Sequence, residues 1–212
     1  MHISEGVLSP AALAAGWAVA GMGTAVGLRR LEPERTVRVA LLSSAFFLAS
    51  LINVRVGPGS THLALIAPVG LVLGWAAYPA ILTALLLQAM LFHFGGLLVL
   101  GPNTADMAVP AVAVYLLFSG PLCRARTSGA AAALSFFAGA LAVLLGALGV
   151  GLFLGLSDGN LLDAAKVLFA AHVPLALIEG AVTAFMVTWL RRAAPDFLER
   201  SSGGQRPPET PS

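Results

Sequence analysis

The sequence predicts an all-α polytopic membrane protein with about seven transmembrane helices, its N-terminus outside the cell and its C-terminus in the cytoplasm. Three observations predict this class: the abundance of apolar residues, their grouping into runs of spanning length, and the uneven placement of basic residues. Of 212 residues, 58% are hydrophobic and 10% are charged, and the mean hydropathy is +0.89. A soluble core of ordinary size does not bury that much apolar surface, so lipid is expected to be the main solvent.

Apolar runs recur along almost the whole chain. Each approaches the roughly 20 residues that a helix needs to span about 30 Å of hydrocarbon, and Gly, Pro and charged residues mark their limits. The third and fifth runs are short, so we expect them to be tilted, broken or packed inside the bundle. The expected spans are residues 8–28, 37–54, 62–77, 79–100, 104–119, 128–155 and 162–190.

The basic residues support an odd number of spans. Lys and Arg are retained on the cytoplasmic side of short loops, and of the twelve present only Arg55 and Lys166 fall outside if the N-terminus is extracellular. The other ten follow the first, fifth and seventh spans: Arg29, Arg30, Arg35, Arg38, Arg124, Arg126, Arg191, Arg192, Arg200 and Arg206.

The first two residues form the strongest candidate binding site. The start MHISEGVLSP lacks the basic and apolar regions of a signal peptide, so we expect the mature chain to begin at Met1. The free α-amine, the amide nitrogen of His2 and its imidazole Nδ1 can close adjacent five- and six-membered chelate rings around one ion. A fourth nitrogen from His62 completes a square plane, the geometry of Ni(II) or Cu(II) with nitrogen donors, and Co(II) accepts the same donors less strictly.

Further polar side chains are expected on the same, extracellular side. Glu5 follows the candidate ligand, and Asn103 falls in an outer turn. His93 and His172 lie in the outer halves of the fourth and seventh spans. We expect these two histidines to support the ligands or to pack inside the bundle rather than to bind the ion directly.

Glu179 lies two helical turns after His172, about 10 Å further along the same face. This position is near the middle of the membrane, where a charged side chain such as Asp costs about 2.5 to 3.5 kcal/mol, so the carboxyl group is expected to have a partner or to face a polar cavity. The sequence leaves two roles open: a hydrogen bond to loop backbone, or a place in the path of the ion.

Several activities find no support in the sequence. It contains no HExxH helix of a metalloprotease and no phosphate-binding GxxxxGK[ST] loop. We therefore predict a transporter component that is not an enzyme. A self-sufficient metal permease or channel is the alternative, although no inverted repeat is evident, and an intramembrane metalloenzyme is a further one.

The chain is expected to comprise one folded domain and a tail. Residues 1–194 form the predicted transmembrane metal-binding domain. Residues 195–212, PDFLERSSGGQRPPETPS, are rich in Pro, Ser, Gly and charge and have no apolar face to bury, so they are predicted to be a disordered cytoplasmic tail.

Four ordered motifs resemble the substrate-binding subunits of cobalt and nickel energy-coupling-factor transporters, the CbiM/NikM type. The motifs are MHISEGVLSP, PGSTHL, LLLQAMLFHFGGLLVLGPNTADMAVP and HVPLALIEGAVTAFMV. Many relatives carry histidine directly before the glycine pair of the third motif. Here Phe94 occupies that place and His93 precedes it.

The resemblance implies a seven-helix subunit in the prokaryotic inner membrane that transports Ni(II) or Co(II). It implies that the amino terminus, His2 and His62 hold the ion at the extracellular face. It also implies partners: a transmembrane coupling subunit of the CbiQ/NikQ type, cytoplasmic ATPase subunits of the CbiO/NikO type, and a small accessory membrane subunit of the CbiN type.

Overall fold

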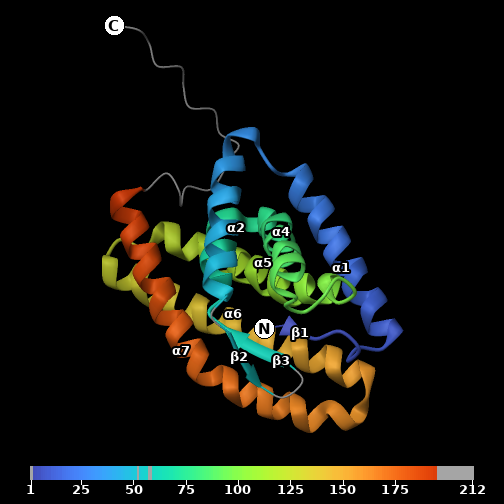
Figure 1. Ribbon diagram of the computed structural model, residues 1–212. Helices are drawn as coiled ribbons and strands as arrows, with labels where there is room; N and C mark the ends of the chain where they lie inside the picture. Colours follow the sequence, from blue (N-terminus) through green and yellow to red (C-terminus); the bar gives the residue numbers. More distant parts are fainter. Residues whose placement is uncertain (1, 52, 57–58, 195–212) are drawn as a thin grey trace, which may run out of the picture.

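The computed structural model describes residues 2–51, 53–56 and 59–194. For residues 53–56 and 59–62 and for Leu162 it describes the backbone alone. The described elements are drawn in Figure 1. The α-helices are α1 (Pro10–Arg29), α2 (Thr36–Ser50), α3 (Ile66–Leu73), α4 (Ala77–Phe92), α5 (Leu100–Arg124), α6 (Ser128–Ser157) and α7 (Leu162–Ala193). The strands are β1 (His2–Ile3), β2 (Asn53–Val56) and β3 (Gly59–His62), and short 3₁₀ helices occupy Pro33–Arg35, Gly74–Ala76 and Gly159–Leu161. The predicted tail, residues 195–212, lies outside the described residues.

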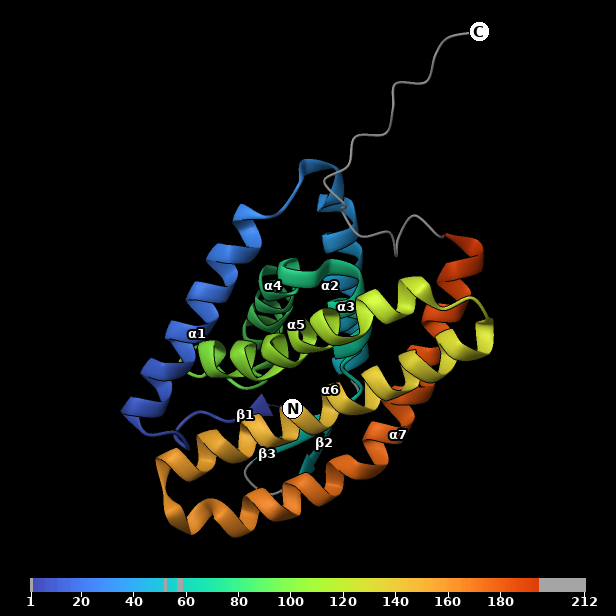
Figure 2. The same cartoon turned by 180° about the vertical axis from the view of Figure 1, so that it is seen from behind.

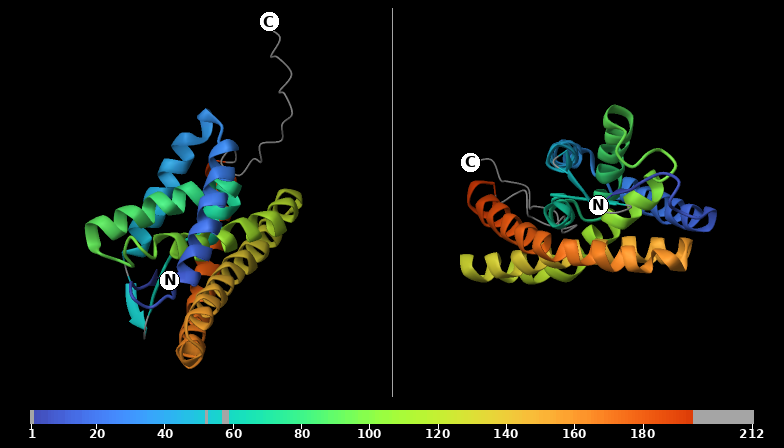
Figure 3. Two further views of the ribbon diagram at one scale, coloured as in Figure 1. Left: turned by 90° about the vertical axis from the view of Figure 1, so that its right-hand side faces the viewer. Right: turned by 60° about the horizontal axis from the view of Figure 1, so that its bottom comes forward.

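The two longest helices, α6 and α7, form one side of the molecule. They run beside each other (Figure 2). The second view of Figure 3 shows this pair along one side of the molecule and the other helices on the other side. The side chain of Arg191 in α7 donates hydrogen bonds to the backbone oxygens of Leu122 (3.0 Å) and Ala125 (2.7 Å) at the end of α5. The last turn of α7 is therefore fastened to the connection between α5 and α6.

The starts of two helices follow ordinary capping chemistry. Ser9 is extended, and its hydroxyl accepts a hydrogen bond from the amide of Ala12, with Pro10 in the first turn of α1. Thr127 caps α6 in the same way through the amide of Ala130. These side chains satisfy backbone donors that have no partner within the helix.

Five helical segments are long and apolar enough to cross a membrane among the described residues: α1, α3 with α4, α5, α6 and α7. Helix α2 has 15 residues and is therefore about 22 Å long, short of the hydrocarbon thickness. The third and fourth predicted spans correspond to one longer apolar segment, Ile66–Phe92, interrupted at Gly74. The seven helices are present in the described chain, whereas seven membrane crossings stay a prediction.

The expectation of an all-α fold is wrong in one region. Residues 53–54 and 62 lie at the ends of the second and third predicted spans, and residues 55–61 in the predicted loop between them. The structure instead has strands β2 at 53–56 and β3 at 59–62, and a third strand is made by His2 and Ile3. The sheet has the order β1-β3-β2 and both pairs are antiparallel. Strands of two to four residues carry too little alternation to be recognised, and their pairing depends on contacts distant in sequence.

Close packing of α3 against α5 gives a prediction on stability. A Cβ at Gly70 would lie 2.1 Å from the backbone oxygen of Ala111, which cannot move without displacing α5. We expect Gly70→Ala to lower the free energy of unfolding by about 1 to 3 kcal/mol, measured by thermal unfolding in detergent. Gly21→Ala on α1 is the matched control, because nothing lies within 4 Å of its Cβ position; equal losses in the two variants would contradict the packing argument.

Candidate functional site

The N-terminal strand lies against strand β3. His2 is paired with Ser60, and Ile3 with Gly59, in an antiparallel register. The side chains of His2 and Ile3 are buried, with 5% and 1% exposed. A chain terminus is usually loosely held unless a sheet or side chains fix it, so the burial of these two residues shows that the start of the described chain is fixed within the fold.

Asn103 on α5 fixes the backbone of the N-terminal strand. Its Oδ1 accepts from the amide of Ile3 at 2.8 Å, and its Nδ2 donates to the oxygen of the same residue at 3.1 Å. The amide side chain thus pairs with both backbone groups of Ile3, as a neighbouring strand would. Asn103 was expected in an outer turn, but it lies in the first turn of α5, where it contacts the residue next to the candidate ligand.

The imidazole of His2 is held by Gln88 on α4. Nε2 of His2 lies 2.8 Å from Oε1 of Gln88. The amide nitrogen of Gln88 faces the backbone oxygen of Phe47 and the hydroxyl of Ser50. Because a backbone oxygen only accepts, this arrangement assigns the amide nitrogen to that side and the amide oxygen to the histidine. Nε2 of His2 therefore carries the proton.

The ring of His2 is also neutral. Burial, followed by the positive charge of the N-terminus, lowers the pKa of His2 from 6.5 to about 3, although the hydrogen bond to Gln88 acts in the opposite direction. A neutral ring protonated at Nε2 has its lone pair on Nδ1. Nδ1, the nitrogen predicted to bind the metal, therefore carries no proton.

Glu5 connects the N-terminal segment to the turn between α4 and α5. Its carboxylate accepts a hydrogen bond from the amide of Leu98 at 2.9 Å, and its own amide donates to Gly95 at 3.2 Å. Gly95 and Gly96 have φ values of 74° and 126°, and a Cβ at Gly96 would lie 2.2 Å from the carboxyl carbon of Glu5. Only glycine permits this contact.

Among the contacts that the structure describes, neither His93 nor His172 is a partner of His2. His93 is exposed and ends α4 in the left-handed region, with φ 55°. The ring of the next residue, Phe94, approaches that of His2 edge-on, with centroids 6.3 Å apart. His172 is fully buried, and its Nδ1 contacts the backbone oxygen of Leu168 at 2.6 Å within α7. His93 is thus an exposed residue at the end of α4, whereas His172 is a buried residue within α7.

Glu179 contacts the segment that follows β3. Its Oε1 accepts hydrogen bonds from the amides of Ala64 and Leu65. Of the two roles left open by the sequence, the structure shows the hydrogen bond to loop backbone.

His62 ends β3, opposite Asn53 of β2. Its side chain, and the whole of Met1, lie outside what the structure describes. Within the described residues no group of three or more His, Cys, Asp or Glu side chains is arranged to hold a metal ion.

Two further features were missed in the sequence. Gln88 was not singled out, although a lone amide within the apolar run LLLQAMLF is itself a signal, and it is fully buried.

Residues 155–159, GLSDG, have the GxSxG spacing of a hydrolase nucleophile. However, Ser157 is the last residue of α6, and its hydroxyl contacts Phe153 and accepts from the amide of Ser9, so it is a helix-end contact.

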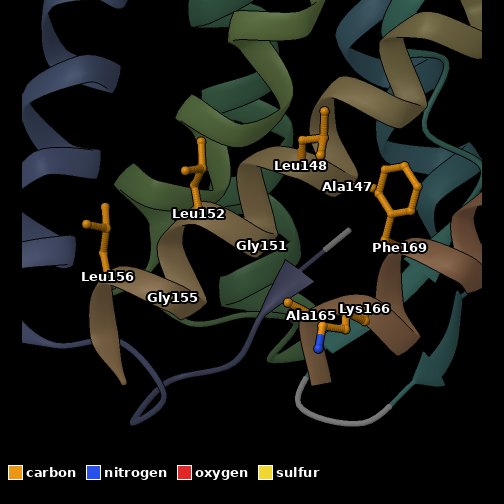
Figure 4. Close-up of a pocket in the computed structure, with 9 residues that line it drawn as sticks. All are labelled: Ala147, Leu148, Gly151, Leu152, Gly155, Leu156, Ala165, Lys166 and Phe169. Atoms are coloured by element: carbon orange, nitrogen blue, oxygen red, sulfur yellow. The ribbon is translucent and has the colours of Figure 1, made fainter. Parts of the chain in front are cut away.

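An apolar groove between α6 and α7 lies apart from these contacts. It encloses about 630 Å³ and is lined by residues that include Gly151, Leu152 and Phe169 (Figure 4). Lys166 at this groove is paired with Asp163 at 2.7 Å. The groove contains no histidine or carboxylate among its lining residues and is not part of the candidate site.

Comparisons with known proteins show the family of the chain. Residues 2–197 match the CbiM family, described as the cobalt uptake substrate-specific transmembrane region. A protein of Haemophilus influenzae assigned to metal transport is 41% identical over 95% of this chain and 98% of its own length. The cobalt transport protein CbiM of Sorangium cellulosum is 33% identical, with 94% and 95% covered.

Two other comparisons extend this set. The fused nickel transport protein NikMN of Rhodobacter capsulatus is 36% identical over 93% of this chain, which spans 64% of the fused protein. A crystal structure of a transition metal transporter matches with a TM-score of 0.72 and 26% identity, covering 91% of this chain and 93% of that one.

The fold and the comparisons together define a multi-pass membrane protein of transition-metal transport. The chain belongs to the CbiM family and is a transmembrane component of cobalt or nickel uptake.

Proposed function

We propose that this chain is the substrate-binding subunit of an ATP-driven energy-coupling-factor importer for Ni(II) or Co(II). It captures the ion at the extracellular face through the amine of Met1, the amide nitrogen and Nδ1 of His2, and an imidazole nitrogen of His62. The observation that carries the proposal is the buried, neutral His2, whose Nε2 is bonded to Gln88. Such a partner fixes the ring and its tautomer for a metal ligand.

The register of the small sheet supports His62 as the fourth donor. Positions 60 and 62 of a strand share one face, and position 2, opposite position 60, shares that face as well. Positions 2 and 62 are then diagonal neighbours, typically about 7 to 8 Å apart between Cα atoms. Two imidazoles at that separation are able to bind one ion.

The positions of the basic residues support an extracellular site. Ser9 contacts Ser157, so the N-terminal segment lies at the end of the molecule where α6 meets α7. The connection from α1 to α2, where Arg30 lies over the ring of Trp75, is far from β1 in Figure 1. If this basic end lies in the cytoplasm, β1 is outside in this proposal.

The energy for transport comes from other subunits in this proposal. The sequence has no GxxxxGK[ST] loop, so nucleotide hydrolysis is assigned to cytoplasmic ATPase subunits of the CbiO/NikO type, linked through a coupling subunit of the CbiQ/NikQ type. An accessory CbiN-type subunit is also proposed, and the fused NikMN relatives favour it. After capture the segment around His62 orders over the ion, and reorientation of this subunit releases it inward.

The contact between His2 and Gln88 gives a direct test. We expect Gln88→Leu, of similar size but without a hydrogen-bonding group, to weaken Ni(II) binding by about 10- to 100-fold, because the ring loses the acceptor that orients it. Isothermal titration of the purified full chain measures this. Thr83→Val on an exposed face of the same helix is the matched control. If Gln88→Leu binds Ni(II) as tightly as the native chain, the contact between Gln88 and His2 no longer supports His2 as a ligand.

A further inference from the structure

Glu179 links the middle of α7 to the segment that carries the proposed fourth ligand. Its carboxyl group is 1% exposed, and one oxygen accepts from two successive amides, those of Ala64 and Leu65, the latter at 3.0 Å. These amides belong to the second and third residues after His62. Ala64 and Leu65 precede Glu179 by 115 and 114 residues in the sequence, so the contact joins distant parts of the chain.

The conformation of this segment depends on the carboxyl group. Leu65 precedes α3 in the left-handed region, with φ 51°, which is unfavourable for a bulky residue and persists only when its surroundings enforce it. No side chain of the segment itself caps α3. The oxygen of Glu179 takes that place, at the helix end where the backbone dipole favours negative charge.

We infer that Glu179 is a positioning residue that holds His62 in place for the ion and connects the ligand to α7. This inference rests on the proposed function. The two amide contacts hold the backbone that leaves β3, the strand that ends at His62. Without these contacts the backbone between β3 and α3 loses this support, and binding of the ion through His62 is expected to weaken.

The test is a double-mutant cycle with Cu(II) as the probe. Cu(II) binds nitrogen donors more strongly than Ni(II) or Co(II), so binding stays measurable when His62 is removed. We expect Glu179→Ala to weaken Cu(II) binding by the native full chain by about 10- to 100-fold. In a His62→Ala background the same change should alter affinity by no more than about twofold. Glu179→Gln, which keeps one acceptor oxygen, should lose less than Glu179→Ala.

Thermal unfolding and a control variant separate positioning from general destabilisation. Thr183→Val is buried on the same helix, one turn further along, and should leave the affinity unchanged. If Glu179→Ala lowers the Cu(II) affinity equally in the native and His62→Ala backgrounds, or in neither, the inference is overturned. This holds even if the melting temperature falls. Unchanged Cu(II) affinity in His2→Ala, measured alongside, would instead overturn the proposed function.

Discussion

Adding one residue before Met1 is expected to weaken Ni(II) or Co(II) binding by about 100-fold or more. Four ligands share roughly 10 to 16 kcal/mol in well-formed metal sites, so each accounts for about 3 kcal/mol, or about two decades of affinity. The extension converts the α-amine into an amide and also introduces a residue where the chelate must close. Titration of the purified extended protein, compared with the native chain, measures the loss.

A cleavable extension provides the control for this experiment. Removal of the added segment by a protease that leaves Met1 as the first residue should restore binding in the same sample. This excludes misfolding as the cause. If the extended protein binds as tightly as the native one, the terminal amine is not a ligand and the proposed chelate is wrong.

His2→Ala is expected to have the second large effect, also about 100-fold or more. It removes Nδ1, opens the six-membered chelate ring, and leaves the fully buried Gln88 without its contact to the ring. His62→Ala should cost less, about 10- to 100-fold, because the three adjacent nitrogens at the terminus remain. Competition with a coloured chelator measures both.

The order of these two losses is the informative result. A larger loss for His62→Ala than for His2→Ala would place the main binding determinant in the β2–β3 region and would contradict the proposed order. Glu5→Gln serves as a neighbouring control, because its carbonyl oxygen still accepts the hydrogen bond from Leu98.

Much of the helical architecture was predictable from the sequence, because apolar runs and cap residues are local signals. The predicted spans 8–28, 128–155 and 162–190 correspond to α1, α6 and α7. The strands were not predicted, because β1 has only two residues and its partner Ser60 is far along the chain.

The candidate site was predictable in part. Chelate chemistry singled out His2 from the first two residues, and depth in the membrane singled out Glu179 as a carboxyl group in need of a partner. The partners themselves were not predictable. Gln88 and Asn103 lie 86 and 100 residues from the groups they bind, and such pairs are set by helix packing rather than by any local pattern.

X-ray absorption spectroscopy of the Ni(II)-loaded full chain tests the central claim most directly. The account predicts four nitrogen neighbours in a square plane, including the imidazoles of His2 and His62, and loss of the planar signature in the extended protein. An ion with six mostly oxygen donor atoms, and a spectrum that does not change when the terminus is extended, would contradict the proposed chelate.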